Sequence, residues 1–152
     1  MAIATRQAEI SWDGTLARGR GTLSSGSGAL ERMPVSWAAR TDRADGKTSP
    51  EELIAAAHAS CFAMALALVL GEAEAPPDRL AITAKCTLDE VEGAPRITSV
   101  ELDIRARVDG LDEAGFQGHL ARAGELCPVS NALRAAVKIG VHGRLESEVA
   151  AD

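Results

Sequence analysis

Residues 49–68 decide the fold, because Ser-Pro-Glu-Glu-Leu-Ile-Ala-Ala-Ala-His-Ala-Ser-Cys-Phe-Ala-Met-Ala-Leu-Ala-Leu predicts one long apolar helix. Ser49 stands at the N-cap position, Pro50 at the first helical position, and Glu52 completes a Ser-x-x-Glu capping box. We expect the helix to run from about residue 50 to about residue 70. Its high alanine content, together with His58 and Ser60, favours a buried helix of a soluble protein over a membrane span.

This helix is apolar on nearly all sides, so other parts of the protein must cover several of its faces. We expect one stripe at helical spacing to face the core: Leu53 or Ile54, Ala57, Cys61, Met64, Ala65 and Leu68. A single small domain covers such a helix with difficulty, whereas a dimer does so easily. The composition therefore predicts a homodimer.

The flanking segments alternate between apolar and polar residues, which predicts strands at 8–12, 15–23, 33–39, 80–89, 100–108 and 137–141. A second helix is expected at 112–126, and Pro128 interrupts it before a shorter helix runs to about residue 135. The order βββ-α-ββ-αα-β groups strands and helices in blocks. It predicts an α+β fold with mainly antiparallel sheet, in one domain with a frayed tail at 147–152.

The composition excludes several classes of function and partner. The chain has 152 residues and a net charge of −6, so it lacks the positive surface that nucleic acids require, and we expect no nucleic-acid partner. Three cysteines do not make a disulfide framework of the secreted type. The first residues show no basic and apolar secretory signal, so we expect a cytoplasmic protein with no membrane partner.

The three cysteines differ in their surroundings. Cys61 lies within the apolar helix, where a small buried hydrophobic residue is a common alternative to a reactive thiol. Cys127 precedes Pro128 at the expected N-cap of the restarted helix, where backbone N–H groups favour a thiolate. On this reasoning alone, Cys127 is the better candidate for a reactive thiol. Cys86 alternates with Ala84 and Leu88 on an inward strand face and is interpreted as packing.

Arg40 follows the third expected strand, where its guanidinium is a candidate to lower a thiol pKa and to hold a peroxide oxygen. Glu51, at the helix start, is a candidate to fix that guanidinium through a bidentate pair. An ordinary surface arginine and a helix-start glutamate remain the alternatives. His58 is interpreted as a packed histidine rather than a base or metal ligand. No metal-ligand spacing is found, so we expect no metal.

Two cysteine-centred motifs carry a family resemblance. Residues 49–68 resemble the first-cysteine helix of the OsmC/Ohr family of thiol-dependent peroxidases, and Cys127-Pro-Val-Ser-Asn-Ala-Leu resembles its second-cysteine motif. The opening Ser11-Trp-Asp-Gly, the stretch Arg18-Gly-Arg-Gly-Thr and Ser27-Gly resemble the OsmC branch in particular. Together these matches cover nearly the whole chain.

The resemblance implies an intertwined homodimer with an OsmC-like domain over residues 1–152. It implies that Cys61, rather than Cys127, attacks an organic hydroperoxide to give a sulfenic acid, with hydrogen peroxide as a further candidate substrate. Cys127 would then form a disulfide with it, and an external dithiol or a lipoylated protein would reduce that disulfide. Arg40 would activate Cys61, and Glu51 would orient Arg40. No metal or organic cofactor is implied.

Two alternatives remain at this point. If the Ohr branch applies, the activating arginine comes from the first hairpin, and Arg18 or Arg20 becomes the candidate. The alternative function is a non-catalytic dimer of the same fold that binds small hydrophobic molecules.

Overall fold

The computed structural model describes residues 1–147 and divides the chain into two compact units, Met1–Leu53 and Ile54–Asp152. Each unit is described by itself below. Of the expected tail at 147–152, only Ser147 lies within the described residues. The single domain expected over residues 1–152 stays a prediction.

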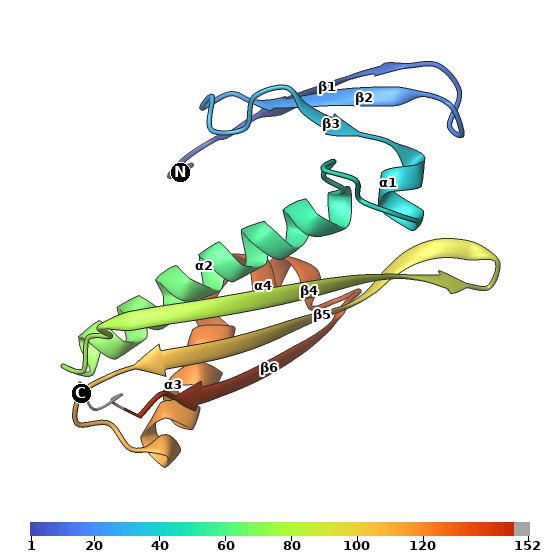
Figure 1. Cartoon of the computed structure of the whole chain (residues 1–152). Coiled ribbons are helices and arrows are strands. Elements are labelled where there is room, and N and C mark those ends of the chain that lie inside the picture. Colours follow the sequence, from blue (N-terminus) through green and yellow to red (C-terminus); the bar gives the residue numbers. More distant parts are fainter. Residues whose placement is uncertain (148–152) are drawn as a thin grey trace, which may run out of the picture. The chain divides into compact units, whose positions relative to one another are not determined.

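The first unit contains a three-stranded antiparallel sheet in the order β1-β2-β3, followed by a short helix (Figure 1). Its elements are β1 (Ala8–Asp13), β2 (Arg20–Ser25), β3 (Met33–Val35) and α1 (Trp37–Thr41). The strand predicted at 33–39 is wrong beyond Val35. Ser36 ends the strand because its hydroxyl accepts a hydrogen bond from the backbone N–H of Ala39 and caps α1. Arg40 therefore lies on a helix.

Helix α2 (Pro50–Glu72) begins as predicted, since the Ser49 hydroxyl accepts a hydrogen bond from the backbone N–H of Glu52. The second half of the predicted capping box differs, because the Glu52 carboxylate accepts a hydrogen bond from the Thr48 hydroxyl. By length and composition alone α2 is apolar enough to cross a membrane, a property that it shares with core helices of soluble proteins.

Burial along α2 differs from the predicted stripe. The fully buried side chains Phe62, Leu66 and Leu70 face the core, whereas Met64 is 68% exposed and Leu68 55% exposed in the single chain. Because every stripe of α2 is apolar, periodicity could not distinguish the face that packs within the chain from the face left open.

The second unit contains a three-stranded sheet in the order β4-β5-β6 (Figure 1). A tight turn at Glu92 and Gly93, both with positive φ, joins β4 (Arg79–Val91) to its antiparallel partner β5 (Ala94–Arg107). β6 (Lys138–Leu145) pairs with β5 in parallel, after a crossover through α3 (Glu113–Leu126) and α4 (Pro128–Leu133). The α+β class and the mainly antiparallel sheet are confirmed, with this one parallel pair.

One apolar cluster fills the second unit between the sheet and its helices. β5 contributes Val100, Leu102, Ile104 and Ala106 to this cluster. The helices contribute Phe62 and Leu66 from α2, and Phe116 and Leu120 from α3. Gly143 of β6 permits the close approach of α3, because a Cβ at this position would overlap the Leu120 side chain. Cys86 is half-buried and packs against the same cluster, which confirms its interpretation as a packing residue. This cluster fixes α2 and the crossover helices, the elements that carry Cys61 and Cys127.

Candidate functional site

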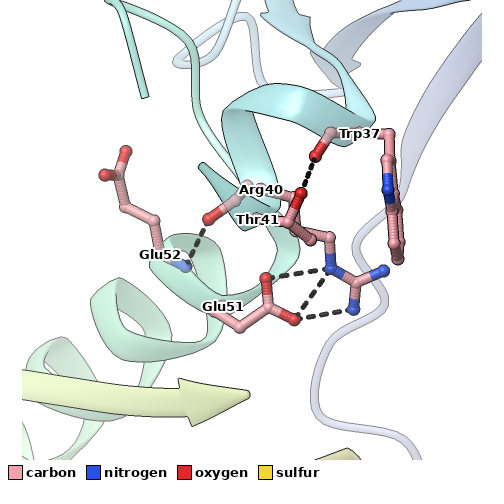
Figure 2. Close-up of polar contacts among 6 residues, drawn as sticks. Trp37, Arg40, Thr41, Glu51 and Glu52 are labelled. Carbon is pink, nitrogen blue, oxygen red and sulfur yellow. Dashed lines mark hydrogen bonds and ion pairs between the residues drawn. The ribbon is translucent and has the colours of Figure 1, made fainter. Parts of the chain in front are cut away.

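The first unit holds an arginine–carboxylate pair. The Arg40 guanidinium donates from Nε to both Glu51 oxygens, at 3.0 and 3.1 Å, and from Nη2 to Oε1 at 2.6 Å. Figure 2 shows the two groups facing each other. These hydrogen bonds raise the pKa of the guanidinium, which is thereby held as a cation in one orientation. The pairing anticipated for Arg40 and Glu51 is therefore present.

The burial of this pair is uneven. The Glu51 side chain is only 10% exposed, while 28% of the Arg40 side chain remains accessible. The indole of Trp37 lies beside the guanidinium, with its ring centroid 5.8 Å from Arg40 Cζ (Figure 2). Glu51 and Trp37 together fix the guanidinium and leave part of its donor set open to a ligand.

An apolar cavity of about 180 Å³ adjoins Arg40 within the first unit. Its walls come from the sheet, from α1 and from the start of α2, and include Ile10, Trp12, Leu16, Leu23, Trp37 and Leu53. A small molecule with an apolar body and one polar end can place the body in this cavity and the polar end against Arg40.

The two candidate thiols lie together in the second unit. Cys61 and Cys127 are both free thiols, and the side chain of Cys61 is within hydrogen-bonding reach of that of Cys127. Cys127 is fully buried, whereas Cys61 is half-buried. As predicted, Cys127 is the N-cap of α4, and its sulfur accepts a hydrogen bond from the backbone N–H of Ser130 at 3.5 Å. The two candidate thiols are thus neighbours within the second unit.

Several neighbours act on the Cys61 thiol in opposite directions. Burial raises its pKa, a hydrogen bond with the backbone of Val129 lowers it, and the adjacent Cys127 raises it again. The net direction is upward. These neighbours therefore favour the protonated thiol of Cys61.

His58 is completely buried on α2, in agreement with its interpretation as a packed histidine. Its Nε2 is hydrogen-bonded to the Ser130 hydroxyl at 2.7 Å, a contact that the sequence interpretation missed. No local pattern signalled this contact, because the two residues lie 72 positions apart in the chain. The sequence analysis also missed the packing of Trp37 against Arg40. Its signal was the spacing of three residues, which places both side chains on one face of a helix.

The remaining predicted positions are separate from these groups. Arg18 and Arg20 are exposed and form no ion pair among residues 1–147. In the same part of the chain, no three His, Cys, Asp or Glu side chains gather to hold a metal ion. Arg40 and Glu51 belong to the first unit, and both thiols belong to the second.

Comparison with known proteins identifies the family. A family model described as OsmC-like protein matches residues 43–142, well over half of the chain. The chain belongs to the OsmC family. It is 40% identical to Peroxiredoxin OsmC of Escherichia coli K12 over 134 residues, which covers 88% of this chain and 93% of that protein. It is 32% identical over 95 residues to the Organic hydroperoxide resistance protein of Xanthomonas axonopodis pv. citri, covering 60% and 63% of the two chains.

Solved structures of OsmC-type proteins share the fold. The organic hydroperoxide resistance protein OsmC from Legionella pneumophila matches with a TM-score of 0.73 at 24% identity, over 94% of this chain and 98% of that one. OhrB of Bacillus subtilis matches with a TM-score of 0.70 at 26% identity, over 91% and 98%. The resemblance to the OsmC/Ohr family and the OsmC-like fold of the chain are confirmed, while the homodimer stays a prediction.

Proposed function

We propose that this OsmC-family protein is a peroxidase that reduces organic hydroperoxides to alcohols in defence against oxidative stress. The observation that carries the proposal is the contact between the free thiols of Cys61 and Cys127. Relatives named Peroxiredoxin OsmC and Organic hydroperoxide resistance protein support the same reaction.

The apolar cavity beside Arg40 supports an organic substrate. Ile10, Trp12 and Leu16 offer an apolar surface for an alkyl or aryl group, and Arg40 offers N–H donors for the peroxide oxygens. Hydrogen peroxide has no group to place in this cavity, so an organic hydroperoxide gains more binding free energy. The preference for organic hydroperoxides over hydrogen peroxide thus comes from the alkyl or aryl group of the substrate and not from its peroxide oxygens.

The reaction proceeds in two steps on the cysteines. The Cys61 thiolate attacks the terminal peroxide oxygen, the O–O bond breaks, and the alkoxide leaves and takes up a proton as the alcohol. Cys61 is now a sulfenic acid. The Cys127 thiol attacks its sulfur, the S–O bond breaks, and the hydroxyl leaves with the thiol proton as water. Two external thiols of a dithiol, free or carried by a lipoylated protein, then reduce the disulfide by exchange. No metal or organic cofactor takes part.

Arg40 supplies the cation that Cys61 needs, and Glu51 holds Arg40 in place. In this proposal the working unit is an intertwined homodimer whose sites use residues of both chains. The exposed apolar side chains support a second copy as the cover of these surfaces, because exposed Ile10, Leu16, Met64 and Leu68 are unfavourable in water. A reducing cytoplasm suits a protein whose resting cysteines are thiols.

The homodimer is tested by sedimentation equilibrium of the purified protein. We expect one species of twice the 15.8 kDa chain mass at micromolar concentration. A Met64→Asp, Leu68→Asp double variant buries two charges in the interface, so we expect it to sediment as the monomer. A wild-type monomer at high concentration would contradict the proposal.

The catalytic cycle is tested by thiol counting with cumene hydroperoxide. One equivalent of peroxide is expected to remove both the Cys61 and the Cys127 thiol and to leave one intramolecular disulfide, located by peptide mass. Cys127→Ser is expected to react with one peroxide per chain and then stall as the Cys61 sulfenic acid, which has no partner thiol. Excess peroxide is expected to oxidise that sulfenic acid to the sulfinic acid, at the cost of a second equivalent per chain. Sustained turnover by Cys127→Ser with a dithiol reductant would exclude Cys127 as the resolving thiol.

The alternative function, binding of a small hydrophobic molecule, is favoured by the same cavity beside Arg40. It predicts that the cavity binds cumyl alcohol and that cumene hydroperoxide is recovered unchanged. A Cys61 thiol that reacts with iodoacetamide only near its free pKa of about 8.5 would also favour the binder.

A further inference from the structure

A buried polar pair joins the helix of one cysteine to that of the other. His58 on α2 is 0% exposed, Ser130 on α4 is 1% exposed, and Nε2 of His58 lies 2.7 Å from the Ser130 hydroxyl. The two residues are 72 positions apart in the chain. Among residues 1–147, His58 Nδ1 is buried without a hydrogen-bond partner. Such a group costs free energy that an apolar side chain at this position would avoid.

The pair continues to the resolving thiol through the backbone of Ser130. The Ser130 side chain bonds His58, and its N–H donates to Cys127 Sγ at 3.5 Å. The Cys127 carbonyl accepts the backbone N–H of Asn131 at 3.0 Å. Both the sulfur and the carbonyl of Cys127 are therefore fixed by the first turn of α4, and His58 attaches that turn to α2.

The same attachment sets the distance to the other thiol. Cys61 follows His58 by three residues on α2, so the two side chains lie on neighbouring positions of one helix face. The backbone of Val129, next to Ser130, lies close enough to Cys61 to lower the pKa of its thiol. The hydrogen bond of His58 with Ser130 thus lies beside the contact between the two thiols and spans the same pair of helices.

We propose that His58 and Ser130 are positioning residues for disulfide formation, because they hold Cys127 Sγ against the sulfur of Cys61. This inference rests on the proposed peroxidase function. The attack of the Cys127 thiol on the Cys61 sulfenic acid competes with a second molecule of hydroperoxide, which oxidises the same sulfur to the sulfinic acid. A positioned thiol accelerates the intramolecular attack, so it decides how much Cys61 escapes over-oxidation. The first oxidation of Cys61 does not involve this hydrogen bond.

The test measures the partition of Cys61 between disulfide and sulfinic acid, by intact mass, over a series of cumene hydroperoxide concentrations. Ser130→Ala and His58→Leu remove the hydrogen bond. Ser130→Thr keeps a hydroxyl at its position, and His58→Gln replaces the imidazole with an amide that can also form a hydrogen bond. Val69→Ala is the matched control, since it loses a buried α2 side chain about two helical turns beyond Cys61 and leaves the His58–Ser130 hydrogen bond in place. A circular dichroism melt of each variant confirms that the measured ratio comes from folded protein.

We expect Ser130→Ala and His58→Leu to form the disulfide at least about tenfold more slowly, because a misplaced reacting group loses at least that much rate. Their Cys61 should therefore reach the sulfinic acid at correspondingly lower concentrations of hydroperoxide. The rate of the first oxidation should stay within about twofold, and Ser130→Thr and His58→Gln should restore most of the partition. If His58→Leu does not fold, Ser130→Ala decides. A wild-type partition in Ser130→Ala, or an equal change in Val69→Ala, overturns the inference. Failure of the wild-type protein to form a disulfide at all overturns the proposed function instead.

Discussion

Cys61→Ser is expected to abolish reduction of cumene hydroperoxide, with a loss of at least about three orders of magnitude in kcat/KM. A serine hydroxyl remains protonated at neutral pH and does not attack a peroxide oxygen, whereas a thiolate does. The substitution replaces one atom in a half-buried position, so the fold should persist. The measurement is steady-state consumption of hydroperoxide with an excess of dithiol, together with a circular dichroism melt.

Cys86→Ser is the matched control for Cys61→Ser. It makes the same atomic change on β4, where Cys86 packs against the core cluster, and the rate should stay within about twofold of wild type because no step of the cycle uses this thiol. Wild-type turnover by Cys61→Ser would refute Cys61 as the attacking thiol. If Cys127→Ser, rather than Cys61→Ser, lost the first oxidation, the order of the two cysteines would be reversed.

Arg40→Met is expected to lower kcat/KM by about 100-fold at pH 7, because a nearby cation lowers a thiol pKa by about one to three units. Burial already raises the pKa of the Cys61 thiol. In the proposed cycle the guanidinium offsets this rise, so its removal leaves less Cys61 thiolate at pH 7 and is expected to move the rate–pH curve to higher pH. Activity should therefore recover in part as the pH is raised. The measurement is kcat/KM between pH 5.5 and 10.

Glu51→Gln is expected to give a smaller loss, about tenfold, because Arg40 keeps its charge but loses the ionic part of the contacts that fix its orientation. Arg18→Met and Arg20→Met provide the controls, since both residues are exposed on the first hairpin. Their rates should stay within about twofold of wild type. A large loss in either of these variants, with Arg40→Met unchanged, would assign the activating cation to the hairpin, as in the Ohr-branch alternative.

Local signals in the sequence predicted the beginning and the type of most elements. Ser49 and Pro50 predicted the start of α2, and Pro128 predicted the break that makes Cys127 an N-cap. The same kind of signal was overlooked at Ser36, whose hydroxyl caps α1, so the third strand was predicted too long. The sequence predicts the ends of helices wherever one side chain hydrogen-bonds the backbone a few residues away.

Other features depend on the whole fold and left no local pattern. The parallel pairing of β5 with β6 follows from a crossover that passes through α3 and α4, and the order of elements alone does not fix its direction. The buried face of α2 could not be read because all faces are apolar. The contact of His58 with Ser130 joins residues that are far apart in sequence, so the sequence around either residue does not predict it. Which of the two thiols attacks the peroxide stays a prediction: helix-dipole reasoning favours Cys127, and the family resemblance implies Cys61.

The position of Cys127 within the crossover has a thermodynamic consequence. A Cys61–Cys127 disulfide would close a loop of about 65 residues that contains all of β4, β5 and α3, and chain-entropy arguments give such a cross-link about 4 kcal/mol of stabilisation. By linkage, the fold stabilises the disulfide by the same amount. Each turnover would therefore leave the oxidised protein harder to unfold and its disulfide harder to reduce. The reductant that restores the thiols must accordingly be a strongly reducing dithiol, and the melting temperature of the protein would report its redox state.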